Sequence, residues 1–125
     1  MQALVIDDSR AMRTILGGIL RNAGFDVVEA EHGRAGLDRL HEGARPDLVM
    51  VDWNLPEMDG LEFLKAARID GGFGDARMVV VTTEGEMERI AEALAEGAHA
   101  SVMKPFAPEG LLGKLERLGP GADVR

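Results

Sequence analysis

Residues 47–60, DLVMVDWNLPEMDG, contain the pattern that decides the fold. An apolar run that ends at Val51 is followed directly by a carboxylate, Asp52, and then by a turn that contains Pro56 and Gly60. A short run that is apolar on both faces and bounded by turn residues is typical of a buried strand in a parallel sheet. Asp52 is therefore either a turn residue or a reactive group at the rim of that sheet.

The same pattern recurs along the chain, and apolar residues at helical spacing follow each run. The expected strands are residues 3–6, 25–30, 47–52, 77–82 and 100–103, and the two helices between the second and fourth strands are expected near 34–42 and 59–69. Strands that alternate with helices indicate an α/β fold, a doubly wound (βα)5 unit whose five-stranded parallel sheet carries helices on both faces.

Turn residues mark the ends of these elements. Gly24 is expected at the C-cap of the first helix, and Gly17 and Gly18 inside that helix have no evident reason from the sequence. The segment 70–76, DGGFGDA, is expected to be a mobile loop, and residues 119–125, GPGADVR, are expected to fray.

Composition restricts the classes of function. The 125 residues suffice for one domain with a single core, and no second domain is expected. A net charge of -8 argues against nucleic acid and an anionic membrane as partners, so a basic protein surface or a cation is the expected complement. The start lacks a signal peptide, no apolar run could span a membrane, and cysteine is absent, so a cytoplasmic protein is expected.

Polar side chains stand where four of the strands end. Asp7 and Asp8 follow the first strand, Asp52 ends the third, Thr82 ends the fourth and Lys104 follows the fifth. In a doubly wound sheet these carboxyl ends lie at one edge, where ligands bind at the switch point of strand order. The five side chains are therefore expected to converge.

Their chemistry points to a cation and a phosphate. Three carboxylates about 5 Å apart repel by roughly 3 kcal/mol per pair at an effective dielectric near 20, so they share protons or recruit an ion. Mg²⁺ prefers such oxygen ligands, and Mn²⁺ is an alternative. Lys104 could bind a phosphate and Thr82 could donate a hydroxyl to it. Asp52 is then a candidate carboxylate nucleophile for phosphoryl transfer.

Each of these residues also has a structural interpretation. Aspartate and threonine at strand ends commonly cap helices or make turns, but capping does not require acids on two strands and a lysine on a third. Trp53 is either surface packing or a reporter of its neighbour Asp52. Pro105 either starts a helix or forms a cis bond that aims the lysine inward. The histidines show no ligand spacing and are expected at the surface: His32, His41 and His99.

The motifs VIDDS (5–9), VDWNLPEMDG (51–60), VVVTTEG (79–85) and VMKPF (102–106) resemble the receiver domain of two-component response regulators over nearly the whole chain. The resemblance implies a flavodoxin-like sheet of order 2-1-3-4-5, an order that the sequence pattern alone does not give. It also implies a receiver domain over residues 1–120 with a flexible tail at 121–125.

Carried over residue by residue, the resemblance assigns a role to each strand end. Asp52 is the phosphoacceptor, which takes its phosphoryl group from a histidine kinase or a phosphotransfer domain. Asp8 and Asp52, with Asp7 through water and the backbone carbonyl of Asn54, hold Mg²⁺. Lys104 binds the phosphoryl oxygens and Thr82 moves toward them, while Asn54 and Glu84 tune the hydrolysis of the acyl phosphate. The protein is thus expected to be a switch that catalyses its own phosphorylation and dephosphorylation, and not an enzyme with a separate substrate.

Within that family, DWN and TxE resemble the stand-alone, CheY-like chemotaxis regulator. A monomer without an output domain is expected, whose phosphorylated form changes its contact with a target protein on the face of helix 4, strand 5 and helix 5, with a phosphatase as a further partner. One position departs from the family: Ser101 stands where an aromatic residue is usual. An intermediate of a phosphorelay or a phosphate sink, without a motor target, is therefore the alternative.

Two other classes fit less well. A haloacid dehalogenase phosphatase also uses an aspartate nucleophile with Mg²⁺, but it needs an acid two residues later, where Ser9 follows Asp7. A flavin carrier of the same fold needs a phosphate-binding loop after the first strand, where this chain has two acids and no glycine-rich motif.

Overall fold

The computed structural model describes residues 1–55, 57–70, 76–83, 87–104 and 106–118, with the backbone alone at 68–70, 87–89 and 118. Its centre is a five-stranded parallel sheet of order β2-β1-β3-β4-β5, as the resemblance implied. The strands are β1 (Gln2–Ile6), β2 (Asp26–Ala30), β3 (Leu48–Asp52), β4 (Arg77–Thr83) and β5 (Ala100–Lys104).

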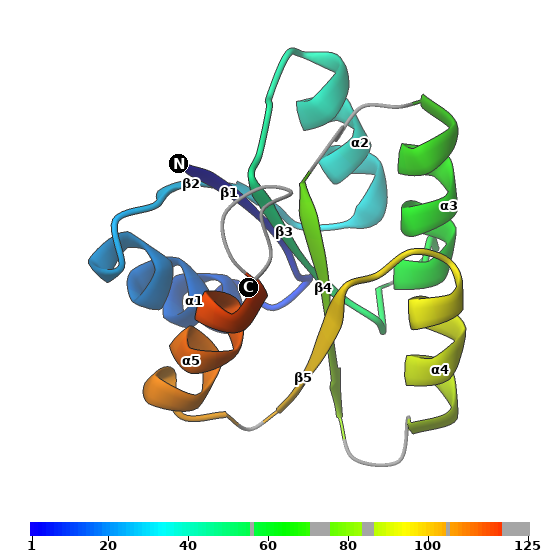
Figure 1. The fold of residues 1–125 in the computed structure, drawn as a ribbon. Coiled ribbons are helices and arrows are strands. Elements are labelled where there is room, and N and C mark those ends of the chain that lie inside the picture. The colour runs from blue at the N-terminus through cyan, green and yellow to red at the C-terminus, as the bar shows by residue number, and fades with distance from the viewer. Residues whose placement is uncertain (56, 71–75, 84–86, 105, 119–125) are drawn as a thin grey trace.

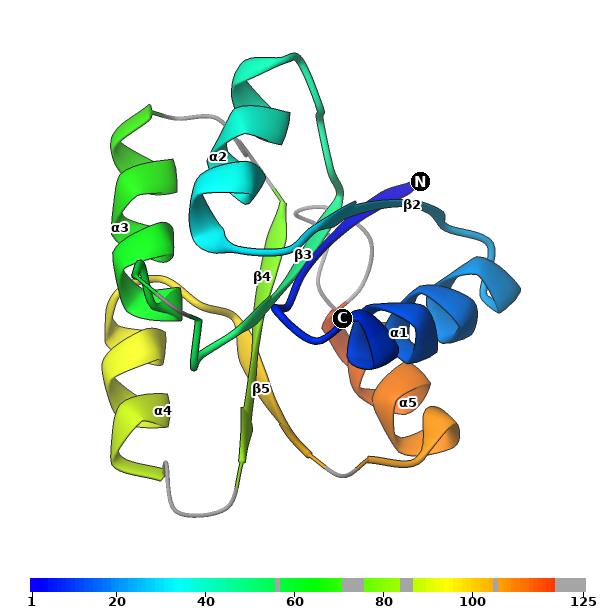
Figure 2. The same cartoon turned by 180° about the vertical axis from the view of Figure 1, so that it is seen from behind.

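A helix follows each strand, so the predicted (βα)5 fold is confirmed. The helices are α1 (Arg10–Asn22), α2 (Gly33–His41), α3 (Gly60–Asp70), α4 (Met87–Ala95) and α5 (Pro108–Leu118). Helices α1 and α5 cover one face of the sheet, and α2, α3 and α4 cover the other (Figures 1 and 2).

The sheet divides the core into two layers, because alternate residues of each strand face opposite sides. Ala3 and Val5 of β1 pack with α1 and α5, whereas Leu4 and Ile6 pack with α2 and α3. Burial on both faces is what the continuous apolar runs in the sequence predicted.

Element boundaries differ from the sequence prediction by one or two residues, with local causes. Phe25 was expected in the second strand, but its backbone N–H donates to Leu20 of α1 (3.0 Å), so it closes the preceding helix. Asp59 was expected inside the third helix and instead caps it. Its carboxylate accepts from the backbone N–H of Glu62 (2.9 Å), whose own carboxylate accepts from the N–H of Asp59 (3.1 Å), a reciprocal capping box.

Helix α1 has a defined cap at each end. The Ser9 hydroxyl accepts a hydrogen bond from the backbone N–H of Met12 (3.1 Å) and so begins the helix directly after the strand-end acids. The helix ends at Asn22 with Ala23 as C-cap, and Gly24 follows at a φ of 99°. The expected glycine stop is thus present one position beyond the cap, where a left-handed backbone is needed.

Several predictions fall outside the described residues: the loop at 71–75 and the tail from 119 onward. None of the helices that the structure describes is long and apolar enough to cross a lipid bilayer.

Candidate functional site

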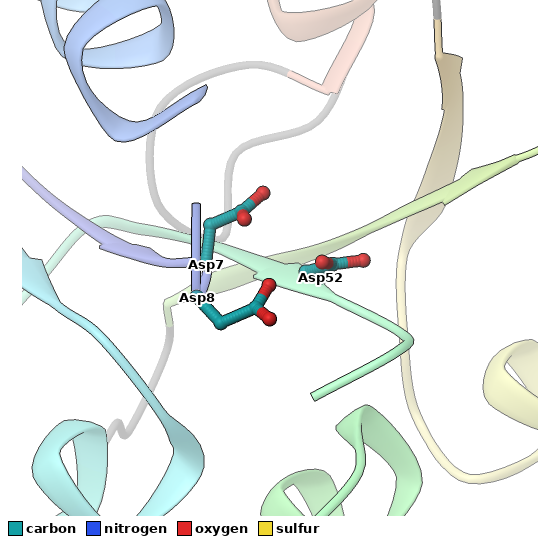
Figure 3. A group of neighbouring side chains, drawn as sticks. All are labelled: Asp7, Asp8 and Asp52. Atoms are coloured by element: carbon teal, nitrogen blue, oxygen red, sulfur yellow. The ribbon is translucent and has the colours of Figure 1, made fainter. Parts of the chain in front are cut away.

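Three carboxylates meet where β1 and β3 end. One oxygen of each of Asp7, Asp8 and Asp52 lies within 4.8 Å of the others (Figure 3). Asp7 and Asp52 are buried whereas Asp8 is exposed, so the group opens to solvent on one side. The predicted convergence of these acids is present, because parallel pairing of β1 with β3 brings their carboxyl ends to one edge.

Lys104 joins the same group from the end of β5. Its Nζ lies 3.1 Å from Asp7 Oδ2 and 3.5 Å from Asp52 Oδ2, and its side chain is only 18% exposed. One ammonium therefore balances two buried carboxylates, and the third acid, Asp8, adds a negative charge. The local charge is net negative, which favours a further cation at the site.

The pKa values reflect this crowding. Burial, followed by the negative charge of Asp7, raises the pKa of Asp52 above its ordinary value, although the N–H of Asn54 and Lys104 act in the opposite direction. Burial alone would lower the pKa of Lys104, but the charge of Asp52 and the hydrogen bond and charge of Asp7 outweigh it, so this pKa is raised. The lysine is firmly protonated, and Asp52 is the acid whose ionisation is disfavoured.

Thr82 supplies a hydroxyl on the neighbouring strand. Asp52 pairs with Val81 across the β3–β4 ladder, so Thr82 stands one residue further toward the same edge. The residue is buried, and within the described part of the chain its Oγ1 makes no hydrogen bond. A buried hydroxyl without a partner carries a free-energy cost, and a ligand oxygen at this edge would remove that cost.

The turn after Asp52 is packed tightly against the core. The backbone N–H of Asn54 donates to Asp52 Oδ1 (3.2 Å) and fixes one carboxylate oxygen. Trp53, whose surface packing was one of two interpretations, is 1% exposed and belongs to the core. A Cβ at Gly60 would lie 2.8 Å from the Trp53 ring, so only glycine allows this close approach. Trp53 is thus a buried neighbour of the acid cluster.

Comparison with known proteins establishes the family. The response regulator receiver domain, as a family, matches residues 3–116. The chain is a member of this family. The match includes all five strand-end side chains, from Asp7 to Lys104.

Individual relatives are similar over nearly their full length. The chemotaxis protein CheY1 of Helicobacter pylori is 40% identical over 117 residues, 93% of this chain and 94% of the relative. A CheY homolog of Campylobacter jejuni is 41% identical over 124 residues, 98% of this chain and 95% of the relative. The solved structure of chemotaxis protein CheY4 of Vibrio cholerae matches with a TM-score of 0.85 and 37% identity over 93% of this chain and 96% of that one.

Other predicted residues of this receiver domain lie near the edge or beyond what the structure describes. Ser101 is part-buried on β5, and its carbonyl accepts from Lys114 Nζ of α5 (2.5 Å). Glu84 and Pro105 lie outside the described residues, so hydrolysis tuning by Glu84 and a cis bond at Pro105 stay predictions.

The histidines lie outside the acid cluster, and His32 and His99 make structural hydrogen bonds. His41 is exposed, as expected. His32 caps α2, where its Nδ1 accepts from the backbone N–H of Ala35 (3.0 Å). His99, although exposed, accepts at Nδ1 from the backbone N–H of Met78 (2.9 Å).

One contact at the site was missed from the sequence. Arg13 of α1 donates from Nη1 to the backbone carbonyl of Asp7 (2.6 Å), and its Nε lies 3.4 Å from a carboxylate oxygen of Glu29. The signal that could have revealed it is the spacing of Arg13, Gly17 and Arg21, which repeats every four residues and so marks one face of α1.

Proposed function

We propose that this receiver domain is a phosphorylation-activated signalling switch that accepts a phosphoryl group on Asp52 from a histidine kinase or a phosphotransfer domain. The observation that carries the proposal is the cluster of three carboxylates within 4.8 Å, two of them contacted by Lys104. A capping or turn role for Asp52 requires neither the acids of β1 nor the lysine of β5.

The donor set suits Mg²⁺. The carboxylates of Asp8 and Asp52 and the backbone carbonyl of Asn54 would bind the ion directly, with Asp7 acting through water, and all of these donors are the hard oxygen atoms that Mg²⁺ and Mn²⁺ accept. When bound, the ion neutralises charge on the carboxylates and on the transferred phosphoryl group. The net negative charge around Lys104 and the solvent-facing Asp8 support this assignment.

The positions of Asp52, Lys104 and Thr82 support the following steps of phosphoryl transfer. A carboxylate oxygen of Asp52 attacks phosphorus as the bond from phosphorus to the imidazole nitrogen of the donor breaks, and that nitrogen keeps the electron pair. Lys104 Nζ leaves Asp52 for the phosphoryl oxygens, and the unpaired Thr82 hydroxyl donates to one of them. Water attack on phosphorus later releases phosphate and resets the switch. The protein promotes both steps on itself and has no separate substrate.

Output would then be a change in protein binding. Apolar side chains are exposed on the face expected for the target, with Leu94 of α4 at 46% and Met103 of β5 at 39% exposure. Movement of Thr82 toward the phosphoryl group alters the end of β4 beside β5, which biases this face between two states. The chemotaxis relatives favour a target in motility.

A phosphorelay intermediate or a phosphate sink is the second candidate. Ser101 favours it, because a small side chain at this position of β5 lacks the ring that would couple Thr82 to the target face. Capture of candidate targets by phosphorylated and unphosphorylated protein separates the two functions. A regulator retains its target in one state only, whereas a sink retains none in either state.

Intact mass after incubation with acetyl phosphate and Mg²⁺, with prompt acid quenching, tests phosphorylation. The wild type is expected to gain one phosphoryl group and Asp52→Asn none. Asp47→Asn is the matched control, because Asp47 precedes β3 at the opposite edge and accepts from the backbone N–H of Gln2 (2.8 Å). If the wild type is unmodified, or if Asp52→Asn is modified as fully as the wild type, the proposed acceptor is wrong.

A further inference from the structure

Arg13 contacts the proposed metal site at the backbone carbonyl of Asp7 and not at a carboxylate of the acid cluster. Its Nη1 donates to the Asp7 carbonyl at 2.6 Å, and its side chain is only 14% exposed. The Nε of the same guanidinium lies 3.4 Å from Glu29 on β2. A planar, rigid guanidinium held at two points fixes both of its partners in direction as well as in distance.

Glu29 in turn is held from two helices. Arg21 Nη2 of α1 lies 3.4 Å from its second carboxylate oxygen, and Arg39 Nε of α2 donates to its backbone carbonyl (3.4 Å). Gly17 lies between the two arginines of α1, where a Cβ would come within 3.1 Å of Arg21 Nη1 and 3.5 Å of Glu29 Oε2. The glycine leaves room for both arginines to reach one carboxylate.

Every polar group of Asp7, in the backbone and in the side chain, has a hydrogen-bond partner. Its N–H donates to the carbonyl of Ala30 (3.2 Å), its Oδ1 accepts from the N–H of Ser9 (2.9 Å) and its Oδ2 contacts Lys104. The remaining group, the carbonyl, is the one that Arg13 holds. Because the peptide bond is planar, fixing this carbonyl fixes the orientation of the N–H of Asp8 and so the direction in which Asp8 leaves the strand.

We propose that Arg13 is a positioning residue of the metal site, which holds the Asp7–Asp8 peptide so that the exposed Asp8 carboxylate is aimed at the bound cation before the cation arrives. This inference rests on the proposed function, because it needs the cation to bind at the acid cluster. Groups that orient metal ligands in this way typically change affinity about 10- to 100-fold when they are removed.

The sign of the effect distinguishes positioning from simple electrostatics. Arg13 is a cation near the site, so removing its charge alone would strengthen the binding of Mg²⁺. Loss of positioning has the opposite effect, since a freed Asp7–Asp8 peptide must be ordered again each time that the ion binds.

Titration with Mg²⁺, followed by Trp53 fluorescence and by calorimetry, tests the proposal in Arg13→Met, which keeps the aliphatic stem and removes both donors. The expected result is an affinity about 10-fold weaker than that of the wild type. Arg34→Met is the matched control, because Arg34 pairs with Asp38 on α2 (3.6 Å) instead of with Glu29, and its affinity is expected to stay within about twofold of wild type. Arg13→Lys keeps the charge without the two-point contact and is expected to bind at least as weakly as Arg13→Met.

A second readout separates positioning from damage to the fold. At saturating Mg²⁺, phosphorylation of Arg13→Met by acetyl phosphate is expected to return to the wild-type rate, because Arg13 contacts no atom that reacts. Glu29→Gln keeps Arg13 but weakens the ion pair that anchors its guanidinium. This variant is expected to lose affinity for Mg²⁺, but less than Arg13→Met does.

The outcomes distinguish this inference from the function on which it rests. If Arg13→Met binds Mg²⁺ as tightly as the wild type or more tightly, the role of Arg13 is wrong while the metal site stands. If Arg13→Met stays slow at saturating Mg²⁺, its defect lies in the fold and the inference is also overturned. If the wild type itself does not bind Mg²⁺, the proposed metal site fails and takes the inference with it.

Discussion

Lys104 Nζ lies 3.1 Å from Asp7 Oδ2, although the two residues are 97 positions apart in the chain. The contact joins the first and the last strand of the chain across the sheet edge. The same ammonium lies 3.5 Å from Asp52, so one cation holds two acids that repel each other. The stability of the ion-free protein and its capacity to bind a cation therefore depend on the same few charges.

Removal of Lys104 should leave the two buried carboxylates of Asp7 and Asp52 without a counter-charge. We expect Lys104→Met to lower the free energy of unfolding by about 3 kcal/mol in EDTA at pH 7. Urea denaturation measures the change. Lys114→Met is the matched control, because Lys114 binds the backbone carbonyl of Ser101 and, among the described residues, no acid, so its loss should cost only about 1 kcal/mol. Equal losses in the two variants would contradict the proposed charge balance.

Added Mg²⁺ should stabilise the folded protein, because the acid cluster exists only when the sheet is formed. At a concentration ten times its dissociation constant, the ion is expected to add about 1.4 kcal/mol and to raise the melting temperature by several degrees. Asp8→Ala should abolish the increase, whereas Asp38→Ala, on the outer face of α2, should retain it. A rise of the same size in Asp8→Ala would place the ion elsewhere.

Asp52 should destabilise the ion-free protein at neutral pH. Its pKa is raised in the folded state, so the folded protein binds a proton more readily than the unfolded chain, and stability falls as pH rises from 3.8 through the folded-state pKa. Asp52→Asn removes this dependence. In EDTA the variant should be more stable than wild type at pH 8, and the advantage should shrink as the pH approaches 4. A constant difference across this range would contradict the assignment.

His99 should produce the opposite pH dependence. Although the residue is exposed overall, partial burial of its imidazole, followed by the charge of Arg77, lowers the pKa of His99 from the ordinary 6.5. The unfolded chain therefore takes up the proton first, and stability falls as pH drops below about 6.5. His99→Asn keeps an acceptor for the N–H of Met78 but cannot titrate, and should lose this part of the pH dependence. Urea midpoints between pH 7.5 and 5 measure it, and identical slopes for the two proteins would exclude the role of His99.

Helical glycines should differ in their response to alanine according to the space around them. Among the residues that the structure describes, nothing lies within 4 Å of a Cβ at Gly18, so Gly18→Ala should add about 1 kcal/mol of stability through helix propensity. A Cβ at Gly36 of α2 would lie 2.5 Å from Ile6 Cδ1 in the core, and Gly36→Ala should cost about 1–2 kcal/mol. Urea denaturation compares the two, and a change of the same sign in both would show that the local space is not decisive.

Placement of the acids could be predicted from the sequence, because alternating strands and helices fix which ends of the strands share an edge. Asp7 directly follows β1, Asp52 ends β3 and Thr82 is the last residue but one of β4, where the chain has no freedom to carry them elsewhere. The strand order itself came from the family resemblance, since alternation alone is compatible with several orders.

Contacts made by long side chains could not be predicted in this way. From the sequence, Lys104 was expected to bind a phosphate, whereas in the structure its ammonium contacts Asp7 and Asp52, which are far from it in the chain. Burial of Trp53 depends on its close approach to Gly60, and the room made by Gly17 depends on where Glu29 lies on another element. Such contacts join residues on different elements, so they cannot be inferred from the spacing of residues in the sequence.

The sheet order β2-β1-β3-β4-β5 also determines when the acid cluster can exist. The acids come from β1 and β3, which are distant along the chain and adjacent only after their parallel pair has formed. Lys104 reaches them only after β4 and β5 have also paired with the sheet. Parallel pairing of this kind is non-local and forms late relative to local helices. A newly synthesised or partly unfolded molecule therefore has the acids but not their arrangement, so the site is confined to chains whose folding is complete.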